Sequence, residues 1–512
     1  MATYVLRRLI LMIPTLIGIT FLVFMIVALS PGGIGAALRH QGGSAEATSI
    51  AAQQAYLEDR YGLNDPAIVQ YLRWLGRVSP VKFGQRDQID PTGAVIRSPR
   101  KLEPPAFAGK WYAQGAVPTH PPPPLFEFDP MDGVDERASI YRRADNQYAR
   151  ARTAYIAART ELEEAIGRYA RAQGVAEPMN RTTRRLQMSA VRGLEFDPNA
   201  EGARPVIEAG ERAIEQYRNA LEVRAELEGI FNAEPFRKVG LPIIPGIMSI
   251  GPPDFGFAFS TGRPVIEIIG SALPITLTLN LIAFPIIYII AIPMGMLAAT
   301  RQGTWIDITS GAFFVALWSI PVVWAGVLAV GYLANVNYLG WFPAAGLSSA
   351  EAGDYPFLPF QDADGVWQAG FLMDRFWHLV LPIACLVYTG FAVLSKQTRA
   401  AMLDNFNSDY VRTAKAKGLP ERTIVFRHVF RNSLLPLITL FATIFPAMLS
   451  GSVIVESIFS INGMGKMVID AINLRDRELL LANVLLIGAT NMLALLLADI
   501  MYALADPRIT YD

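Results

Sequence analysis

The chain has 512 residues, of which 52% are hydrophobic, and its 45 basic and 45 acidic residues give a formal net charge of zero. The single cysteine, Cys385, excludes an intrachain disulfide and any metal site built from several cysteines. The neutral total hides an uneven distribution, because uncharged apolar runs alternate with one long charged stretch.

The first apolar run begins close to the N-terminus and covers Leu9–Leu29 without a charged residue. About 20 mostly apolar residues suffice to cross a bilayer as a helix. A cleaved signal peptide is the alternative, because Arg7 and Arg8 precede the run and small residues follow it. The apolar core of such a peptide is only about 7–15 residues long. We therefore predict a retained membrane span within residues 1–30.

Residues 31–271 separate the first apolar run from the second, and their centre carries a heptad pattern typical of soluble helices. An aromatic or apolar residue recurs every seven positions from Tyr141 to Tyr169, and an alanine follows each of them three positions later. This seam predicts a helix over about 135–173. The alanines would let a partner helix approach closely.

A second heptad pattern begins with Pro205, at a favourable first helical position, and predicts a partner helix over about 205–232. Arg224 and Glu228 interrupt its seam. We therefore predict a helical hairpin that projects from the membrane, with an intermolecular coiled coil as the alternative. The stretch 104–130 is rich in proline, which favours an extended linker.

Five further apolar runs follow residue 271, and each is long enough to cross a bilayer as a helix. Only the last contains a charged side chain, Asp499, near its end. Together with the first run they predict an all-α polytopic membrane protein with six transmembrane helices. The five runs are Ala272–Ala299, Ile308–Asn335, Phe376–Ser395, Ser433–Val455 and Leu479–Ala503.

The basic residues beside the spans predict their orientation, because cytoplasmic loops carry an excess of Lys and Arg. If the N-terminus is cytoplasmic, the alternation of the six spans places every basic cluster on the cytoplasmic side, either in a terminus or in a loop between two spans. Residues 31–271 then lie outside, and a region this long is translocated despite its arginines. The sequence predicts a multi-pass inner (plasma) membrane protein with both termini cytoplasmic. The clusters are Arg7 with Arg8, Arg301, the segment from Lys396 to Arg431, and Arg508.

The segment 408–436, "SDYVRTAKAKGLPERTIVFRHVFRNSLLP", lies between the fourth and fifth spans and is strongly basic. Each Lys or Arg at the bilayer centre costs about 2.5–3.5 kcal/mol, so the segment must lie in the cytoplasm. Charge alone also fits an ordinary cytoplasmic loop. The spacing of the small residues Thr413, Ala414 and Gly418 is more specific, as is the distance from Gly418 to His428 and Asn432.

In this spacing the segment resembles the coupling loop, or EAA loop, of the membrane subunits of ABC importers. Thr413 and Ala414 occupy its two alanine positions and Gly418 its glycine position. Arg412 stands where that pattern has glutamate, and Arg431 where proline is common. The resemblance implies that a loop over 396–432 docks in a groove on a separate ATPase. The residues expected to take part are Arg412, Thr413, Ala414, Lys415, Gly418, Leu419, His428 and Asn432.

Other stretches resemble the dipeptide, oligopeptide and nickel branch of these permeases, in the same order along the chain. They include "YVLRRLILMIPTLIGITFLVFMIVALSPGG", "YGLNDPAIVQYL", "DFGFAFSTGRPVIEIIGSALPITLTL" and "VESIFSINGMGKMVIDAINLRD". The wording of "FRHVFRN" and "SINGMG" favours a B-type subunit of the subtype that imports oligopeptides and microcin C. The predicted division is a first span (1–30), outer segments (31–84 and 253–271), an insertion without a counterpart (85–252) and a permease core (272–505).

The resemblance implies the type I ABC importer permease fold and a role in ATP-driven import by alternating access. Two ABC ATPase subunits would bind ATP and Mg, and a homologous second permease would complete the pore in the lipid bilayer. An extracytoplasmic solute-binding protein would deliver the substrate, a di- or oligopeptide or a related solute. No cofactor, metal, catalytic residue or nucleic-acid partner is expected for this chain. An outer gate or a contact with the binding protein is expected at Glu456, Asn462, Gly463 and Gly465.

Two alternatives belong to other classes of protein. A secondary transporter would need an ion-coupling site, usually built from acids within the membrane; only Asp499 lies within a predicted span. A membrane-anchored scaffold would use the hairpin as its working part, for which six spans are excessive. An enzyme that hydrolyses ATP is excluded, because "SINGMGKMV" lacks the first glycine and the final hydroxyl of a P-loop.

Overall fold

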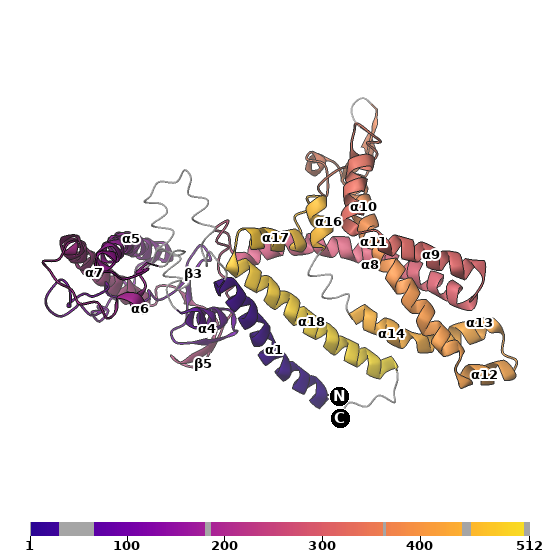
Figure 1. Cartoon of the computed structure of the whole chain (residues 1–512), viewed down its shortest axis with the longest axis horizontal. Coiled ribbons are helices and arrows are strands. Elements are labelled where there is room, and N and C mark those ends of the chain that lie inside the picture. The colour runs from indigo at the N-terminus through magenta and orange to yellow at the C-terminus, as the bar shows by residue number, and fades with distance from the viewer. Residues whose placement is uncertain (1, 30–65, 180–185, 362–364, 443–451, 506–512) are drawn as a thin grey trace. The chain divides into compact units, whose positions relative to one another are not determined.

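The computed structural model describes residues 2–29, 66–179, 186–361, 365–442 and 452–505 (Figure 1). Within it the chain divides into two compact units. One comprises Met1–Val23 with Gly256–Asp512, and the other comprises Phe24–Phe255. We call them the membrane unit and the insertion unit.

Four helices of the described chain are long and apolar enough to cross a membrane. They are α1 (Ala2–Leu29), α8 (Val265–Thr300), α11 (Gly370–Phe406) and α18 (Arg477–Ala505). The helices α8 and α11 pack along each other. Gly295 permits this close approach, because a Cβ atom there would lie 2.6 Å from the carbonyl oxygen of Ser395.

The third predicted span is not a continuous helix, because it is broken at Pro321 into two pieces. Helix α9 (Trp305–Ser319) ends before Pro321. Helix α10 (Val322–Leu328) continues into the π-helix η1 (Ala329–Ala334), and this second piece lies at an angle of 82° to α9. Pro321 has no N–H to donate, and its ψ of 137° turns the chain out of the helix. The Ile320 carbonyl accepts a hydrogen bond from Tyr388 Oη at 2.9 Å, which attaches the bend to α11. The two pieces count as a fifth span if they cross together.

The fifth predicted span, Ser433–Val455, falls partly outside the described residues. Helix α14 (Arg431–Ala442) covers its beginning, and α16 (Val453–Ile458) begins near its end. The remaining elements of the membrane unit are short. They are η2 (Ala352–Asp354), β7 (Phe360–Gln361), β8 (Trp367–Gln368), α12 (Asp409–Ala416), α13 (Glu421–Thr423), η3 (Ile424–Phe430) and α17 (Met464–Asn473).

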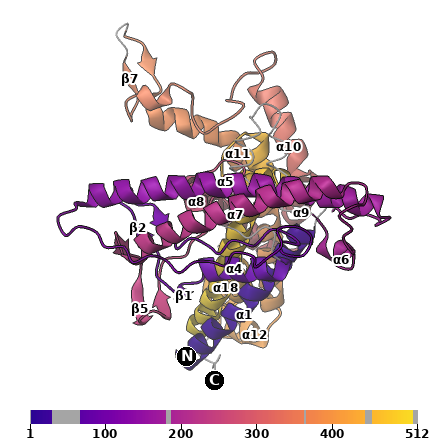
Figure 2. The same cartoon turned by 90° about the vertical axis from the view of Figure 1, so that its left-hand side faces the viewer.

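The insertion unit is built on two long helices, α5 (Val134–Ala172) and α7 (Ala203–Asn232), which lie side by side (Figure 2). The Tyr/Ala seam of α5 is buried against α7 of the same chain; the Tyr155 and Tyr217 rings lie 5.2 Å apart. The seam is therefore occupied and is not free to pair with a second chain. The short helices of this unit are α4 (Ala67–Val78) and α6 (Met188–Val191).

Two small antiparallel sheets join the hairpin to the rest of its unit. The first has the order β1-β6-β5, with β1 (Val81–Phe83), β6 (Met248–Ile250) and β5 (Leu241–Ile244). The second has the order β3-β2-β4, with β3 (Val95–Ile96), β2 (Gln88–Ile89) and β4 (Arg237–Lys238). Because β1 and β6 are paired, the two ends of the insertion lie next to each other.

The proline-rich stretch 104–130 packs on the hairpin, so the expectation of a linker was wrong. Tyr112 is buried, and a Cβ atom at Gly210 of α7 would lie 2.4 Å from its ring. The ring of Trp111 stacks on that of Phe196 at 5.0 Å. The chain is extended here because prolines prevent helix formation, but its aromatic side chains cover the hairpin.

Arg224 does not merely interrupt the seam of α7, as the heptad pattern suggested. Its guanidinium is buried and donates to the carbonyls of Arg100 (2.6 Å) and Pro99 (2.9 Å), as well as to Glu228 (2.8 Å). The extended chain has no sheet partner here, so Arg224 supplies hydrogen-bond donors for its backbone.

His120 gives the insertion unit a predicted dependence on pH. Its Nε2 accepts a hydrogen bond from the Leu102 N–H at 2.8 Å, which requires the neutral ring. Burial, together with the positive charge of Arg224, lowers the pKa of His120 below its ordinary value of 6.5. The unfolded chain therefore binds this proton more readily, and the contribution to stability is present above about pH 6.5 and lost as the pH falls below it.

We expect the thermal midpoint of the detergent-solubilised protein to fall between pH 7.5 and pH 5. In a His120→Gln variant this fall should be smaller by about 2 °C, since the titrating group is gone. An identical fall in both proteins would show that the charge on His120 does not affect the stability.

Candidate functional site: the loop between α11 and α14

The loop that follows α11 begins with the eight-residue helix α12, which ends in a Schellman motif. The Gly418 N–H donates to the carbonyl of Lys415 at 2.9 Å, and the Leu419 N–H donates to that of Ala414 at 3.3 Å. Gly418 has φ +70°, a conformation that glycine adopts without strain. Pro420 then starts α13, so the chain turns sharply between two helical pieces.

The inner side of the loop is a small hydrophobic core. Val411 and Ala414 of α12 meet Val425 and Val429 of η3, and both pairs pack on the ends of α8 and α11. The buried contacts on those two helices are Ala299 and Met402.

A chain of hydrogen bonds also holds the loop to its neighbours. Tyr410 Oη donates to Asn405 Oδ1 at 2.6 Å, and Asn405 Nδ2 donates to Ser433 Oγ at 3.1 Å. These three residues belong to α12, α11 and α14. The loop is therefore fixed to two long helices and is not a freely moving connection.

The outer side of the loop exposes polar and small side chains, and we call it the loop surface. Thr413 Oγ1 donates to the Asp409 carbonyl at 3.0 Å, and Arg412 pairs with the Asp409 carboxylate at 3.6 Å. No atom lies within 4 Å of a Cβ placed on Gly418. The loop surface consists of Arg412, Thr413, Lys415, Lys417, Gly418, Leu419 and Phe426, all exposed.

The predicted loop residues divide into two groups. Ala414 was expected on the outer side, but it is only 5% exposed and packs inward, because it lies three residues after Val411 on the same helical face. His428 is half-buried, whereas Asn432 is exposed. Phe426, which sequence reasoning did not select, is 55% exposed and adds an apolar side chain to the loop surface.

A bidentate ion pair beside the loop was also missed. Asp307, at the start of α9, receives Arg399 Nε at 2.6 Å on Oδ1 and Arg399 Nη2 at 2.8 Å on Oδ2. Asp307 also accepts the Gly303 N–H at 3.0 Å. This pair connects the α8–α9 turn to α11. Arg399 lies about two helical turns before Phe406, the last residue of α11. The sequence signals of this pair are weak: Asp307 directly precedes the apolar run Ile308–Asn335, and Arg399 follows the run Phe376–Ser395.

The predicted outer group is mostly buried. Glu456 is 0% exposed and accepts hydrogen bonds from Thr276 Oγ1 (2.9 Å) and from the Lys466 N–H (3.0 Å). Thr276 Oγ1 in turn accepts the Met464 N–H at 2.8 Å. The Glu456 carboxylate and the Thr276 hydroxyl thus satisfy the free N–H groups at the start of α17.

The two glycines of this group leave room for that arrangement. A Cβ atom at Gly463 would lie 2.5 Å from Thr276 Oγ1, and one at Gly465 would lie 2.6 Å from the Val453 nitrogen. Only Asn462 is at the surface, where its Oδ1 accepts from Lys466 Nζ at 2.8 Å. Glu456, Gly463 and Gly465 lie buried between α8, α16 and α17, an arrangement that we call the bracket, so they offer no surface to a binding protein in this structure. An outer gate at these residues stays a prediction.

Replacing Glu456 tests this bracket. Glu456→Ala removes the acceptor of the Thr276 hydroxyl and of the Lys466 N–H, which should destabilise the protein by about 2–4 kcal/mol. Glu456→Gln keeps one acceptor oxygen and should lose clearly less. Thermal unfolding of the purified variants measures both. Equal stability of the alanine variant and the wild type would contradict the bracket.

Known proteins resemble this chain over its membrane unit. A family profile described as "Binding-protein-dependent transport system inner membrane component" matches residues 291–511. The oligopeptide transport system permease protein AppB of Bacillus subtilis is 38% identical over 260 residues, which is 50% of this chain and 76% of AppB. The dipeptide transport system permease protein DppB of Alkalihalophilus pseudofirmus is 31% identical over 268 residues, 50% of this chain and 78% of DppB.

The chain belongs to the family of binding-protein-dependent transport system inner membrane components. It is the permease component of an ABC importer and a multi-pass inner membrane protein. The inner membrane permease YejB of Escherichia coli O157:H7 is 34% identical over 260 residues, 51% of this chain and 68% of YejB. A solved inward-facing structure of the MetNI methionine ABC transporter aligns with 47% of this chain and 97% of that chain, at 14% identity and a TM-score of 0.35.

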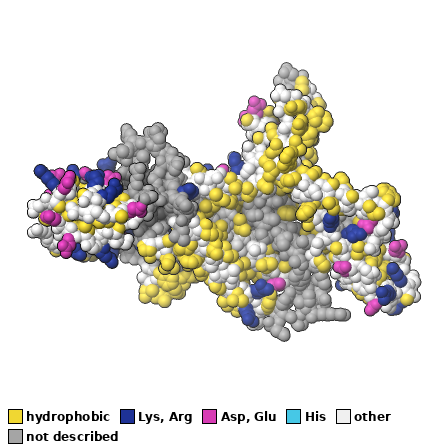
Figure 3. All heavy atoms as spheres, in the orientation of Figure 1, with side chains coloured by type: hydrophobic (Ala, Val, Ile, Leu, Met, Phe, Trp, Pro, Cys, Tyr) yellow, Lys and Arg dark blue, Asp and Glu magenta, His cyan; other side chains and the backbone are white. Residues whose placement is uncertain are grey.

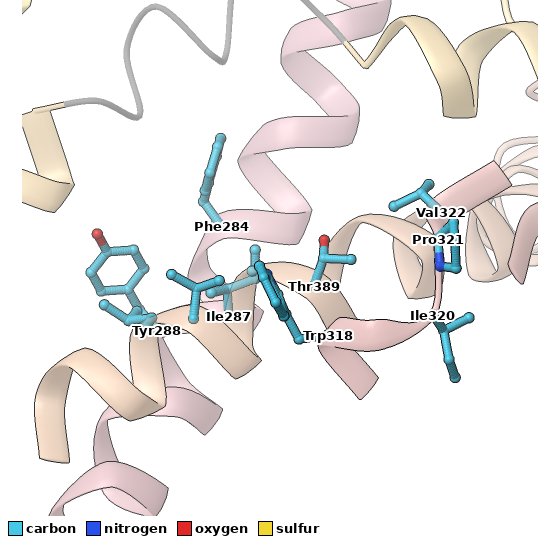
Figure 4. Close-up of a pocket in the computed structure, with 11 residues that line it drawn as sticks. Phe284, Ile287, Tyr288, Trp318, Ile320, Pro321, Val322 and Thr389 are labelled. Carbon is cyan, nitrogen blue, oxygen red and sulfur yellow. The ribbon is translucent and has the colours of Figure 1, made fainter. Parts of the chain in front are cut away.

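The described part of the permease contains a cavity of about 600 Å³ beside the bend at Pro321 (Figure 4). Side chains of α8, including Phe284 and Tyr288, and of α11, including Thr389, line it together with Trp318 of α9. No charged side chain lines this cavity. It is therefore suited to apolar groups and not to an ion-coupling site of the kind that a secondary transporter needs.

The permease also buries charges that sequence reasoning missed at the start of α18. Asp476 accepts both the N–H and the hydroxyl of Ser260 at 2.9 Å. Arg477 donates to Glu478 Oε1 at 2.7 Å, and its guanidinium lies 5.6 Å from the centre of the Phe259 ring. These contacts bind the segment before α8 to the N-terminus of α18. They explain why four charged residues, 475–478 ("RDRE"), directly precede the apolar run Leu479–Ala503.

Proposed function

We propose that this permease imports peptides, driven by ATP that two separate ABC ATPase subunits bind with Mg and hydrolyse. The observation that carries the proposal is the loop surface. Small and basic side chains are exposed there on a loop that is fixed by Val411 and Tyr410 to two long helices. A force applied to such a loop is passed to α8 and α11, because packed helices move as rigid elements.

The proposed orientation follows from the same loop. The loop and both chain termini face the cytoplasm, and residues 31–271, which make up most of the insertion unit, lie on the outer side. The chain itself forms the six-helix type I fold, and a homologous second permease completes the pore. An extracytoplasmic binding protein delivers the substrate, and the pore opens alternately to the two sides.

The names of the relatives support a peptide as the substrate. AppB is named for oligopeptides and DppB for dipeptides. The alternative of a secondary transporter is weakened by the ion pairs of Asp499 and Asp307. Asp499 accepts from Tyr4 Oη at 2.8 Å and pairs with Arg8 at 3.1 Å, and Asp307 pairs with Arg399. Acids held in such ion pairs are poor ligands for a transported ion.

Uptake of labelled di- and oligopeptides by cells that express the complete set of subunits tests this function. ATP-dependent accumulation that is lost when the permease gene is deleted is the expected result. Accumulation that follows a proton or sodium gradient and is insensitive to loss of ATP would support the secondary transporter instead.

A further inference from the structure

The insertion unit exposes an apolar surface that its own hairpin does not cover. The β5–β6 ribbon, residues 241–250, contains no charged side chain. All four residues of β5 are exposed, so both faces of the ribbon are open. Figure 3 shows hydrophobic side chains gathered in this region of the molecule. Its most exposed members are Phe83 (77%), Leu241 (74%), Ile247 (61%) and Ile250 (50%).

Helix α4 extends this surface. Its inner face buries Tyr71 and Trp74, whereas Ile68 (60% exposed) and Leu72 (59%) point outward, four residues apart on one stripe. Arg73 and Arg77 are half-buried and lie on a neighbouring stripe of the helix, four residues apart. A helix with an exposed apolar stripe and basic residues beside it is typical of a helix that lies in a membrane interface.

The ribbon and α4 are joined into one surface. Helix α4 packs on β1, which pairs with β6, which pairs with β5. Lys82 of β1 donates through Nζ to the carbonyl of Arg77, at the end of α4. We call the exposed apolar side chains of α4, β1, β5 and β6 the apolar surface.

The inner face of α4 packs against the C-terminal end of the first membrane span, α1. Phe24 of α1 is fully buried, and its ring meets the Tyr71 ring of α4 edge to face, with the centroids 5.4 Å apart. Phe24 lies five residues before Leu29, the last residue of α1. At 1.5 Å per residue this is about 7–8 Å before the end of the helix. Helix α4 is therefore held at a depth at which α1 is still within its apolar run.

We propose that the apolar surface is a membrane anchor: α4 lies in the bilayer interface beside the C-terminal end of α1, and the β5–β6 ribbon dips into the acyl chains of the same leaflet. Contact with acyl chains explains why a ribbon of this length lacks charged residues on both faces. In water such a ribbon, with an exposed edge strand, would be prone to associate. The anchor would fix the base of the α5–α7 hairpin to the membrane surface.

Depth measurements in the full-length protein test the anchor. Cys385 is the only cysteine and is buried, so a Cys385→Ala background permits a single label at each chosen site. Environment-sensitive fluorophores at Leu72→Cys, Leu241→Cys and Ile247→Cys are compared in lipid nanodiscs that contain nitroxide on the acyl chains. Met131→Cys is the matched control, since Met131 is an exposed apolar residue (90%) of the same unit beside α5. Leu22→Cys, on α1, marks the bilayer.

The expected result is quenching by the nitroxide lipids at least twofold stronger at positions 72, 241 and 247 than at Met131. Aqueous iodide should quench in the opposite order. Quenching equal to that of Met131 would overturn the proposal. Protection from both quenchers would also overturn it, because a protein partner or a second copy would then cover the surface. No lipid quenching at Leu22 would instead show that α1 does not lie in the membrane. The measurement at Leu22 therefore distinguishes a failure of the proposed anchor from a failure of the proposed membrane position of α1.

Discussion

Gly418→Phe is expected to reduce ATP-driven uptake at least tenfold, whereas Gly418→Ala keeps most of it. Both substitutions place a Cβ in a left-handed backbone conformation (φ +70°), and both should lose about 1 kcal/mol of local stability. The two variants differ in the size of the side chain. The phenylalanine side chain would extend into open space, since no atom lies within 4 Å of a Cβ at Gly418. The additional bulk of phenylalanine therefore adds a block to close approach by the ATPase that alanine does not add.

Uptake of labelled peptide is measured together with the amount of each variant in the membrane, which should equal that of the wild type. The comparison of the two variants separates docking from helix capping. Equal uptake by the alanine and phenylalanine variants would show that nothing approaches the backbone at Gly418. Equal loss in both would show that only the Schellman motif matters.

Arg399→Ala should strongly destabilise the described membrane unit. It leaves the Asp307 carboxylate, which is 7% exposed, without its bidentate partner. Loss of one member of a buried pair costs about 3–5 kcal/mol. We expect about 2–3 kcal/mol here, because the Arg399 side chain is one-third exposed. Arg399→Lys keeps the charge but not the two parallel hydrogen bonds, so its loss should be intermediate.

The thermal midpoint of the solubilised complex reports these losses. The double variant Asp307→Asn with Arg399→Gln serves as the control. It should be more stable than the sum of the two single losses predicts, because neither variant side chain leaves a buried charge behind. Additive losses would mean that the pair does not connect α9 to α11.

Sequence periodicity is informative where one repeating pattern decides the structure. The heptads of α5 and α7 bury one face each, and predicted limits of 135–173 and 205–232 compare with Val134–Ala172 and Ala203–Asn232. The apolar runs likewise predict α1, α8, α11 and α18, because the length needed to cross a bilayer is fixed.

The sequence is less informative where tertiary contacts decide the outcome. Pro293 and Pro382 lie inside unbroken helices, whereas the helix breaks at Pro321, where Tyr388 donates a hydrogen bond to the bend. The sequence predicts Glu456 at an outer gate or a contact with the binding protein, but Thr276, far away in sequence, contacts it in the interior. The ion pair between Asp307 and Arg399 likewise joins residues that are far apart in the sequence.

The proposed function requires that the loop surface binds an ATPase. A photo-crosslinking amino acid at Thr413 or Lys415, two exposed positions of α12, tests this claim directly in membranes that contain the whole transporter. The same amino acid at Asn462, an exposed position before α17, serves as the control. We expect an adduct with an ATP-hydrolysing subunit from positions 413 and 415 and none from position 462. No ATPase adduct at either loop position, in a complex that takes up substrate, would contradict it.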